Sequence, residues 1–459
     1  MTMQYFKPDG NFFVGDCMPF FHDGTFRLYY LLDEGHFGAA GGLGGHQWAQ
    51  ASTEDLVHWT HHPLAIPITE EREGSICTGS VFFHDGMYYG FYATRRRDLK
   101  QHISLAKSKN GIHFTKTSPN PLVSPPPGYN PCHYRDPVVF HDPETGLFHM
   151  LVTALLDDYP LAGRGGCLEH LVSRNLVNWE HKEPFLIPGF VDVPECPDYF
   201  FWNGWYYLVF SNGGVARYRM SRQPLGSWSR PTVDILDGGF SLVMKTAAFT
   251  GNRRIGVSWL GGRVGEKDSG AQEFAGNAVF RELVQHADGT LGTRFLPEML
   301  PQGRETFTPA PDALTTGTQC KPGNVRLDAP HGMEAALLKG VPRNFRITAE
   351  ISGVSGTGVF GLRLRRSGNR TDYAIDRGYD VCLDPTSKTV QLHAQVITRV
   401  EGLQHPFRLD LIAVESLIDL CLDNRRCLID RCPEQQGDSL LFYAWDAAAT
   451  FNNIRITAL

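Results

Sequence analysis

Residues 19–31 read PFFHDGTFRLYYL: an apolar pair, a short polar turn that contains glycine, and an aromatic-rich segment. The same pattern returns as VFFHDGMYYGFYA (81–93), VVFHDPETGLFHMLV (138–152), YFFWNGWYYLVFS (199–211) and, more weakly, AAFTGNRRIGVSWL (247–260). A polar turn with glycine between two apolar runs indicates a β-hairpin, because glycine adopts the left-handed turn conformation at little cost. The copies begin about 50 to 62 residues apart, a period typical of β-propeller blades.

A second pattern follows most of these hairpins. Serine begins a short polar segment that ends in tryptophan at Ser52–Trp59, Ser173–Trp179 and Ser221–Trp228. We interpret these segments as turns between the outer strands of each blade. Together, the hairpins and turns predict five four-stranded blades between residue 1 and about residue 300, of which the fifth has the weakest pattern.

The pattern changes after Pro301 to short alternating segments that are typical of β-sandwich strands. Examples are Phe345–Ile351, Val359–Leu364, Thr389–Val396 and Phe407–Val414. The predicted fold is therefore all-β, with a five-bladed propeller followed by a C-terminal β-sandwich. We place the propeller at residues 1–304 and the sandwich at residues 305–459.

The composition excludes several classes of protein. The 459 residues include 43 Lys and Arg against 49 Asp and Glu, a net charge of −6, which makes nucleic acid an unexpected partner. No apolar run approaches the roughly 20 residues that span a bilayer, and residues 1–9 do not read as a signal peptide. We therefore expect no membrane partner and a cytoplasmic location. Nothing in the sequence specifies an oligomeric state.

The ten cysteines include no CxxC pair, which argues against a zinc ribbon. They are also too sparse for a disulfide scaffold. The histidines show no metal-ligand spacing. We therefore expect reduced, mostly buried thiols, and no metal or cofactor in the chemistry of this protein.

Polar residues recur at one position of the repeat. Five residues before the phenylalanine of each of the first four turns lie Asp16, Thr78, Arg135 and Glu195, and Asp136 follows Arg135. Equivalent residues on the innermost strands of a propeller point toward its axis, so we expect three carboxylates and an arginine to meet there. Strand capping is the alternative for a single Asp, but it accounts poorly for three acids at one phase of a repeat.

Paired carboxylates are the catalytic residues of glycosidases. One protonates the leaving oxygen, while the other attacks the anomeric carbon or activates water. Glu195 lies between Pro194 and Cys196, in surroundings that we expect to be desolvated. Desolvation raises the pKa of a carboxyl group, so Glu195 is the candidate acid. Asp16, which follows Gly15, is the candidate ionised partner.

Several motifs resemble those of glycoside hydrolase family 32, the β-fructofuranosidase, invertase and fructanase family. Arg135-Asp136-Pro137 matches its RDP motif, and Glu195-Cys196 matches its EC motif. The segments WAQASTEDLVHW (48–59), Thr78-Gly79-Ser80, FRELVQHADGTL (280–291) and LIAVESLIDLCLDNRRCLIDR (411–431) resemble further family segments in the same order. The resemblance covers nearly the whole chain, and the family fold, a five-bladed propeller and a β-sandwich, agrees with the repeat.

The resemblance also implies residue roles. Asp16 would be the nucleophile that forms a fructosyl-enzyme, Glu195 the general acid and then base, and Asp136 the stabiliser of the transition state. The substrate-binding residues would be Arg135, Trp48, Gln50, Thr78, Gly79, Ser80 and Cys196. A mechanism of this kind retains the anomeric configuration and requires catalytic carboxyl groups about 5 to 5.5 Å apart.

The nucleophile segment departs from the family motif WMNDPNG. Phe13 to Pro19 reads FVGDCMP and keeps only the Asp, and Gln50 and Thr78 also differ from the family residues. We expect altered sugar contacts at these positions. The favoured function is release of fructose from sucrose, short fructo-oligosaccharides or fructans. The alternatives are a fructosyltransferase, a propeller glycosidase for another furanoside such as an arabinoside, and a noncatalytic carbohydrate-binding protein.

Overall fold

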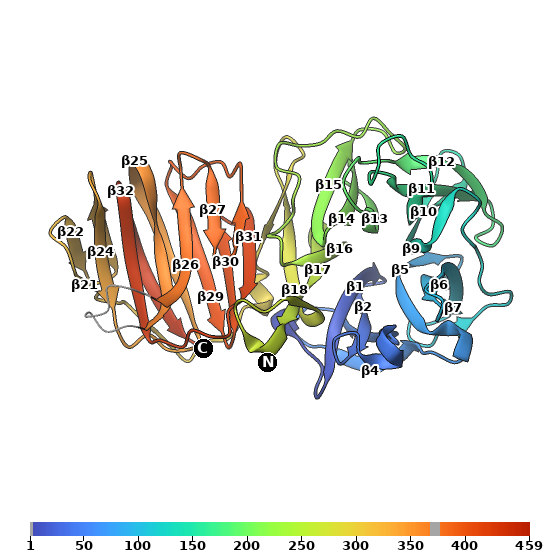
Figure 1. The fold of residues 1–459 in the computed structure, drawn as a ribbon, viewed down its shortest axis with the longest axis horizontal. Helices are drawn as coiled ribbons and strands as arrows, with labels where there is room; N and C mark the ends of the chain where they lie inside the picture. The colour runs from blue at the N-terminus through green and yellow to red at the C-terminus, as the bar shows by residue number, and fades with distance from the viewer. Residues whose placement is uncertain (1–2, 368–376) are drawn as a thin grey trace.

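The computed structural model describes residues 3–367 and 377–459, and it is built almost entirely of β-strands (Figure 1). Residues 1–2 and 368–376, which belong to the predicted domains, lie outside the described residues. The helices are single turns: α1 (Ala39–Gly42), η1 (Met3–Tyr5), η2 (Glu71–Glu73), η3 (Thr250–Asn252), η4 (Val264–Glu266) and η5 (Pro297–Met299). No helix within the described ranges is long and apolar enough to cross a membrane. The prediction of an all-β fold is confirmed.

The strands up to residue 294 pair in consecutive antiparallel groups. The first two groups are β1 (Phe12–His22), β2 (Thr25–Glu34), β3 (Gln47–Thr53) and β4 (Thr60–Ile66), then β5 (Ser75–His84), β6 (Met87–Arg95), β7 (Gln101–Ser108) and β8 (Thr115–Lys116). The third group is β9 (Tyr129–Asp142), β10 (Leu147–Leu156), β11 (Gly166–Ser173) and β12 (Glu180–Leu186). The last two are β13 (Glu195–Trp202), β14 (Trp205–Asn212) and β15 (Val215–Ser221), then β16 (Leu242–Phe249), β17 (Arg253–Arg263), β18 (Gln272–Gln285) and β19 (Leu291–Arg294).

The repeated turns fold as the sequence predicts. Asp23-Gly24 and Asp85-Gly86 each join two strands by a two-residue loop, and every φ in these loops lies between 47° and 73°. Asn203-Gly204 does the same between β13 and β14, with φ values of 46° and 81°. Positive φ at both loop positions gives the turn a twist that matches the strands, and glycine meets this requirement with little strain.

The innermost strands close into a ring. β1 packs against β5, β5 against β9, β9 against β13, β13 against β16, and β16 returns to β1. The labels of these five strands surround the centre of the right-hand body in Figure 1. The groups thus form the predicted propeller, although the fourth group has three strands, β13 to β15, where four were predicted. Side chains that the innermost strands turn inward meet at its axis.

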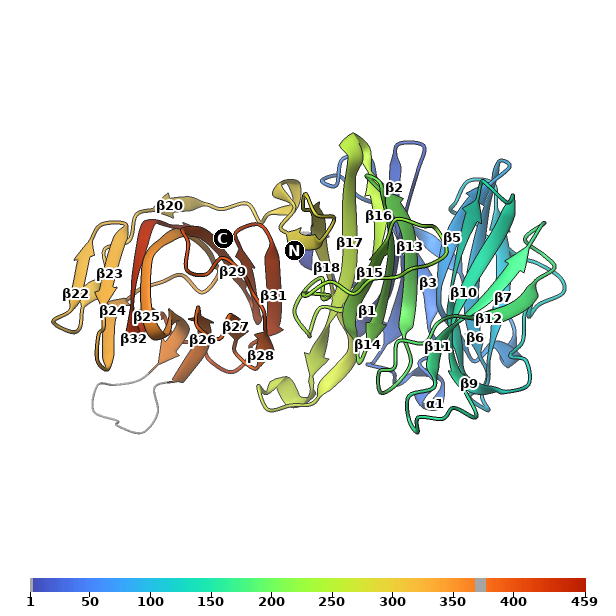
Figure 2. The same cartoon turned by 90° about the horizontal axis from the view of Figure 1, so that it is seen from above.

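The remaining strands form the predicted sandwich around a second hydrophobic core. They are β20 (Glu305–Phe307), β21 (Asp312–Ala313), β22 (Thr318–Lys321), β23 (Asn324–Asp328), β24 (Met333–Leu338), β25 (Phe345–Ser367), β26 (Arg377–Asp384), β27 (Thr389–Leu392), β28 (Gln395–Ile397), β29 (Phe407–Val414), β30 (Leu417–Leu422), β31 (Arg426–Arg431) and β32 (Ser439–Ala458). The long partners β25 and β32 bend over this core, as Figure 2 shows, and the fully buried Ile347, Phe442 and Phe451 lie within it. The boundary at residues 304 and 305 stays a prediction; β20 begins at Glu305 and pairs with β32.

A buried ion cluster joins the propeller to the sandwich. Arg281 of β18 binds Asp237 with Nε (2.6 Å) and Asp419 of β30 with Nη1 (2.9 Å) and Nη2 (2.7 Å). Tyr5 donates its hydroxyl to the same Asp419 at 2.9 Å. These side chains are shielded from solvent, so each charge depends on its partners, and the pair of Arg281 with Asp419 lies across the interface.

Candidate active site

All five innermost strands carry a β-bulge. Two residues on each inner strand lie opposite a single residue of the neighbouring strand. The bulged pairs are Gly15-Asp16 in β1, Cys77-Thr78 in β5, Asp136-Pro137 in β9, Cys196-Pro197 in β13 and Val243-Met244 in β16. A bulge changes the direction of nearby side chains. Because each innermost strand has one, residues beside the bulges of different strands can point toward the same place. Proline is compatible with these positions because a bulge leaves a backbone N–H unpaired.

Asp16 lies at the centre of the resulting cluster. Its Oδ1 accepts a hydrogen bond from Nε1 of Trp259 at 2.9 Å. Its Oδ2 accepts one from the Thr78 hydroxyl and lies 3.5 Å from Sγ of Cys196. Donors from three other groups, on β5, β13 and β17, therefore fix the orientation of this carboxylate, while the side chain keeps some exposure.

Glu195 and Arg135 form an ion pair at the start of β13. Nη2 of Arg135 donates to Oε1 of Glu195 at 2.7 Å, and the Glu195 side chain is 27% exposed. Burial raises the pKa of Glu195, the positive charge of Arg135 opposes this increase, and the negative charge of Asp136 adds to it. The net direction is upward, which is the direction that the predicted acid role requires.

Asp136 is buried beside both other acids. The backbone N–H of Cys196 donates to its Oδ2 at 3.1 Å, and Nε of Arg135 lies 3.6 Å from the same oxygen. Burial raises the pKa of Asp136, the charge of Arg135 lowers it, and the charge of Asp16 raises it again. The first bulged residue of β9, Asp136, has a φ of 57°, and that of β13, Cys196, has a φ of 50°. The backbone is thus bent to bring these groups together.

The structure brings Thr78, Gly79 and Cys196 to the predicted site. Gly79 approaches the neighbouring strand so closely that a Cβ atom there would lie 1.8 Å from the carbonyl oxygen of Phe91. Its backbone N–H points to Sδ of Met18 at 3.2 Å. Ser80 is the next residue, and its buried hydroxyl has no hydrogen-bond partner among the described residues. Thr78 and Gly79 thus reach the site from β5, and Cys196 reaches it from β13, through contacts with Asp16 and Lys245.

Trp48 and Gln50 point elsewhere. Trp48 is fully buried and donates its indole N–H to the carbonyl oxygen of Cys77 at 2.9 Å. Gln50 donates to the carbonyl oxygens of Pro63 (2.9 Å) and Ile112 (2.7 Å). Both side chains therefore bind backbone carbonyl groups behind the site. Their positions do not favour contact with a substrate, which stays a prediction for both residues.

The sequence patterns did not identify two residues of the site. Lys245 of β16 is buried and donates from Nζ to the carbonyl oxygen of Gly79 at 2.9 Å, and its positive charge lowers the pKa of the neighbouring Asp136. The signal for Lys245 was its place in the fifth copy, where it lies four residues before Phe249, as Asp136 lies four before Phe140. Trp259 lies on β17, the second strand of its group, where the repeat gives no signal.

The arrangement can perform acid–base chemistry on a bound sugar. It offers a fixed carboxylate (Asp16), a second acid with a raised pKa (Glu195), and an arginine and a lysine that balance the negative charge. The protein is a propeller joined to a sandwich, and paired carboxylates lie at the propeller axis. A site with paired carboxylates is of the kind that glycoside hydrolases use, and this defines the class of protein.

The comparison with protein families identifies the family. Residues 6–291 match the N-terminal domain of glycosyl hydrolases family 32. The chain therefore belongs to this family, as its motifs predict.

Curated relatives extend this result. The chain is 26% identical to sucrose-6-phosphate hydrolase of Escherichia coli over 293 residues, which are 57% of this chain and 58% of that protein. It is 28% identical to levanbiose-producing levanase of Bacillus subtilis (strain 168) over 224 residues, which are 46% of this chain and 39% of that protein. The alignments thus span about half the length of these relatives.

Solved structures show the same fold over the full length. Fructan 1-exohydrolase IIa from Cichorium intybus superposes with a TM-score of 0.74 at 17% identity, covering 100% of this chain and 97% of that chain. Sucrose-6-phosphate hydrolase from Lactobacillus gasseri also gives 0.74, at 15% identity, covering 100% and 93%. The predicted order of propeller and sandwich is therefore confirmed as the family architecture.

Proposed function

We propose that this protein is a retaining glycoside hydrolase that releases fructose from β-fructosides. Convergence of Asp16, Asp136 and Glu195 from three bulged strands carries the proposal, because a retaining glycosidase needs a fixed nucleophile beside a protonated acid. Family membership and the names of the curated relatives supply the substrate class, and they do not favour the transferase and arabinoside alternatives.

In the first step, Asp16 attacks the anomeric carbon of the fructosyl group while Glu195 protonates the leaving oxygen. The donors from Trp259 and Thr78 hold the two oxygens of Asp16 and so fix its line of attack. The raised pKa of Glu195 keeps a proton available at pH values where an ordinary Glu would be ionised.

In the second step, Glu195 acts as a base and activates water, which attacks the fructosyl-enzyme and restores Asp16. Asp136 would hold sugar hydroxyls throughout, since it interacts electrostatically with both reacting groups and shares the Cys196 thiol with Asp16. Arg135 binds Glu195 directly and therefore orients the acid in both steps. The anomeric configuration is retained because two inversions occur.

Incubation with sucrose, inulin-type and levan-type oligosaccharides and aryl arabinosides tests this proposal, with products separated by chromatography. We expect free fructose from the wild-type protein and none from Asp16→Asn. The amide keeps the shape of the side chain, so equal melting temperatures would assign the loss to chemistry. Release of arabinose alone, or equal fructose release by Asp16→Asn, would contradict the proposal.

A further inference from the structure

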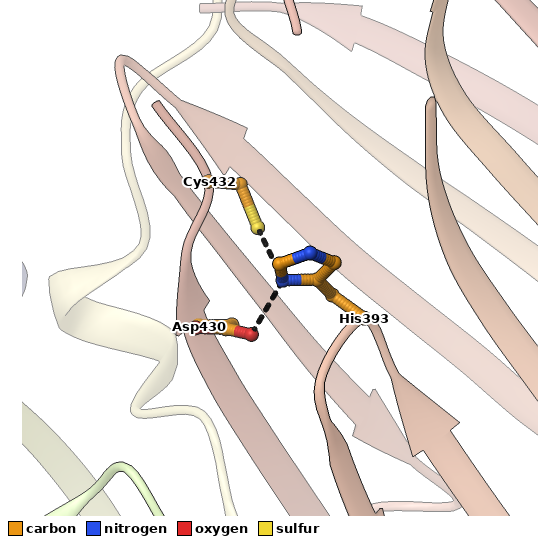
Figure 3. Close-up of side chains that lie close together, drawn as sticks. All are labelled: His393, Asp430 and Cys432. Carbon is orange, nitrogen blue, oxygen red and sulfur yellow. Dashed lines mark hydrogen bonds and ion pairs between the residues drawn. The ribbon is translucent and has the colours of Figure 1, made fainter. Parts of the chain in front are cut away.

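Three side chains that commonly bind metals meet on the sandwich, away from the propeller axis (Figure 3). His393 lies in the turn between β27 and β28, Asp430 is in β31, and Cys432 follows β31 directly. Nδ1 of His393 lies 3.0 Å from Oδ2 of Asp430 and 4.0 Å from Sγ of Cys432. All three atoms lie within 4.8 Å of one another, and this is the one such group found among residues 3–367 and 377–459.

An ordinary hydrogen bond explains only part of this geometry. The ring N–H at Nδ1 can point at Asp430 or at Cys432, yet both acceptors face the same nitrogen. A cation in place of that proton would be ligated by all three. Imidazole nitrogen, carboxylate oxygen and thiolate sulfur together are the donor set of a borderline dication such as Zn²⁺.

The surrounding residues hold the donors in position. Oδ1 of Asp430 accepts hydrogen bonds from Nη2 of Arg263 (2.9 Å) and from the backbone N–H of Arg431 (2.7 Å), which leaves Oδ2 directed at the histidine. The backbone N–H of Cys432 donates to the carbonyl oxygen of Ser416 at 2.6 Å. Outer contacts of this kind orient the ligands of metal sites in proteins.

Charge and access are also compatible with a cation. Burial raises the pKa of the Cys432 thiol, and the charges of Asp430 and Asp268 raise it further, so a bound cation would have to displace the thiol proton. The resulting thiolate and Asp430 would contribute two negative charges, and Asp268 a third. Arg263 is paired with Asp430, and Arg365 donates to the carbonyl oxygen of Cys432 at 3.2 Å. Asp430 and Cys432 are buried, whereas the His393 side chain is 23% exposed, which gives a path from solvent.

We propose that His393, Asp430 and Cys432 bind one divalent transition-metal ion, of the Zn²⁺ type, at the edge of the sandwich that faces the propeller. Because Asp430 is also bound to Arg263 of β17, the ion would reinforce the contact between the two parts of the chain. The catalytic chemistry proposed above does not involve this site.

Titration of the chelator-treated full chain with Co²⁺ tests the proposal, since cobalt bound to thiolate gives an intense charge-transfer absorption. We expect this band to saturate at one equivalent and to disappear on addition of Zn²⁺. Cys432→Ser should abolish the band, and His393→Gln should weaken binding by more than about 10-fold, because each removes a direct ligand. Cys320→Ser, which changes a thiol elsewhere in the sandwich, is the matched control and should titrate like the wild type.

The melting temperature of each apo variant shows whether it is folded. Failure to observe the band in the folded wild type would overturn the proposal, as would an unchanged band in folded Cys432→Ser. If Cys432→Ser fails to fold, the His393→Gln titration decides instead, and wild-type affinity there would overturn the site.

Discussion

The indole nitrogen of Trp259 lies 2.9 Å from Oδ1 of Asp16, across 243 positions of sequence. The contact links β17, at the end of the propeller, to β1, at its beginning. The same two groups are joined by the pairing of β18 with β1, through Val14 and Gly276. Closure of the ring therefore also completes the hydrogen bonding of the proposed nucleophile, so loss of closure would cost both stability and activity.

Replacement of Trp259 by phenylalanine tests this relationship, because it keeps an aromatic ring and removes the donor. A hydrogen bond to a charged group contributes about 1.5 to 3 kcal/mol. We expect kcat to fall roughly 10- to 150-fold, with a smaller change in KM. Steady-state kinetics with sucrose would measure this effect, and an unchanged kcat in a folded variant would show that the indole donor is dispensable.

The raised pKa of Glu195 predicts the pH profile of the enzyme. The acid must be protonated, so kcat/KM should fall as pH rises through the pKa of Glu195, and a raised pKa moves this limb above the range of an ordinary Glu. An aryl fructoside with a good leaving group needs little proton donation, so Glu195→Gln should keep measurable activity on it, without the alkaline limb. An alkaline limb that persists in Glu195→Gln would assign it to another group.

Arg135 sets the position of that alkaline limb. Its positive charge lowers the pKa of Glu195, so removing the charge in Arg135→Met should shift the limb to higher pH as well as reduce kcat. Arg135→Lys keeps the charge but loses the planar geometry, so it should reduce kcat with a smaller shift of the limb. Equal limbs in the wild type and in Arg135→Met would show that Arg135 does not control Glu195.

Gly79 is a position where the backbone itself limits substitution. A Cβ atom added there would lie 1.8 Å from the carbonyl oxygen of Phe91, and rotating a side chain cannot relieve this clash. Gly79→Ala should displace β5, and with it the carbonyl that binds Lys245 and the hydroxyl that binds Asp16. We expect strong loss of activity together with a lower melting temperature. Gly226→Ala, where no atom lies within 4 Å of an added Cβ, is the matched control.

The sequence predicted most of the fold because the repeat is local. Each hairpin contains its own turn, and alternation of apolar residues defines its strands, so the propeller needed no long-range information. The sandwich lacks such a repeat. Phe345–Ile351 and Val359–Leu364 were predicted as separate strands, yet both belong to the single bent strand β25. Register shifts against β32 accommodate the bend, and they leave no clear mark in an alternating pattern.

The site was predicted in part for the same reason. Asp16, Arg135 and Glu195 occupy one phase of the repeat, on innermost strands that pack into one ring. Asp16 lies within the bulge of β1, whereas Arg135 and Glu195 directly precede the bulges of β9 and β13. Trp259 comes from a second strand, so its contact with Asp16 depends on how neighbouring groups pack. Trp48 belongs to a matching motif, but its side chain is fully buried. A tryptophan in such a motif can serve core packing as well as sugar contact, and the sequence does not distinguish the two roles.

Arg281 provides the sharpest test of how the propeller and sandwich hold together. Its guanidinium is fully buried and carries the ion pairs with Asp237 and Asp419. Removing one partner of a buried pair leaves an uncompensated charge, which costs about 3 to 5 kcal/mol. Arg281→Met should therefore lower the melting temperature markedly, and the double variant with Asp419→Asn should recover part of the loss.

Lys388→Ala, which removes an exposed pair with Glu401, should change stability by only about 0 to 1 kcal/mol. Equal melting temperatures for Arg281→Met and Lys388→Ala would show that the buried cluster does not hold the interface.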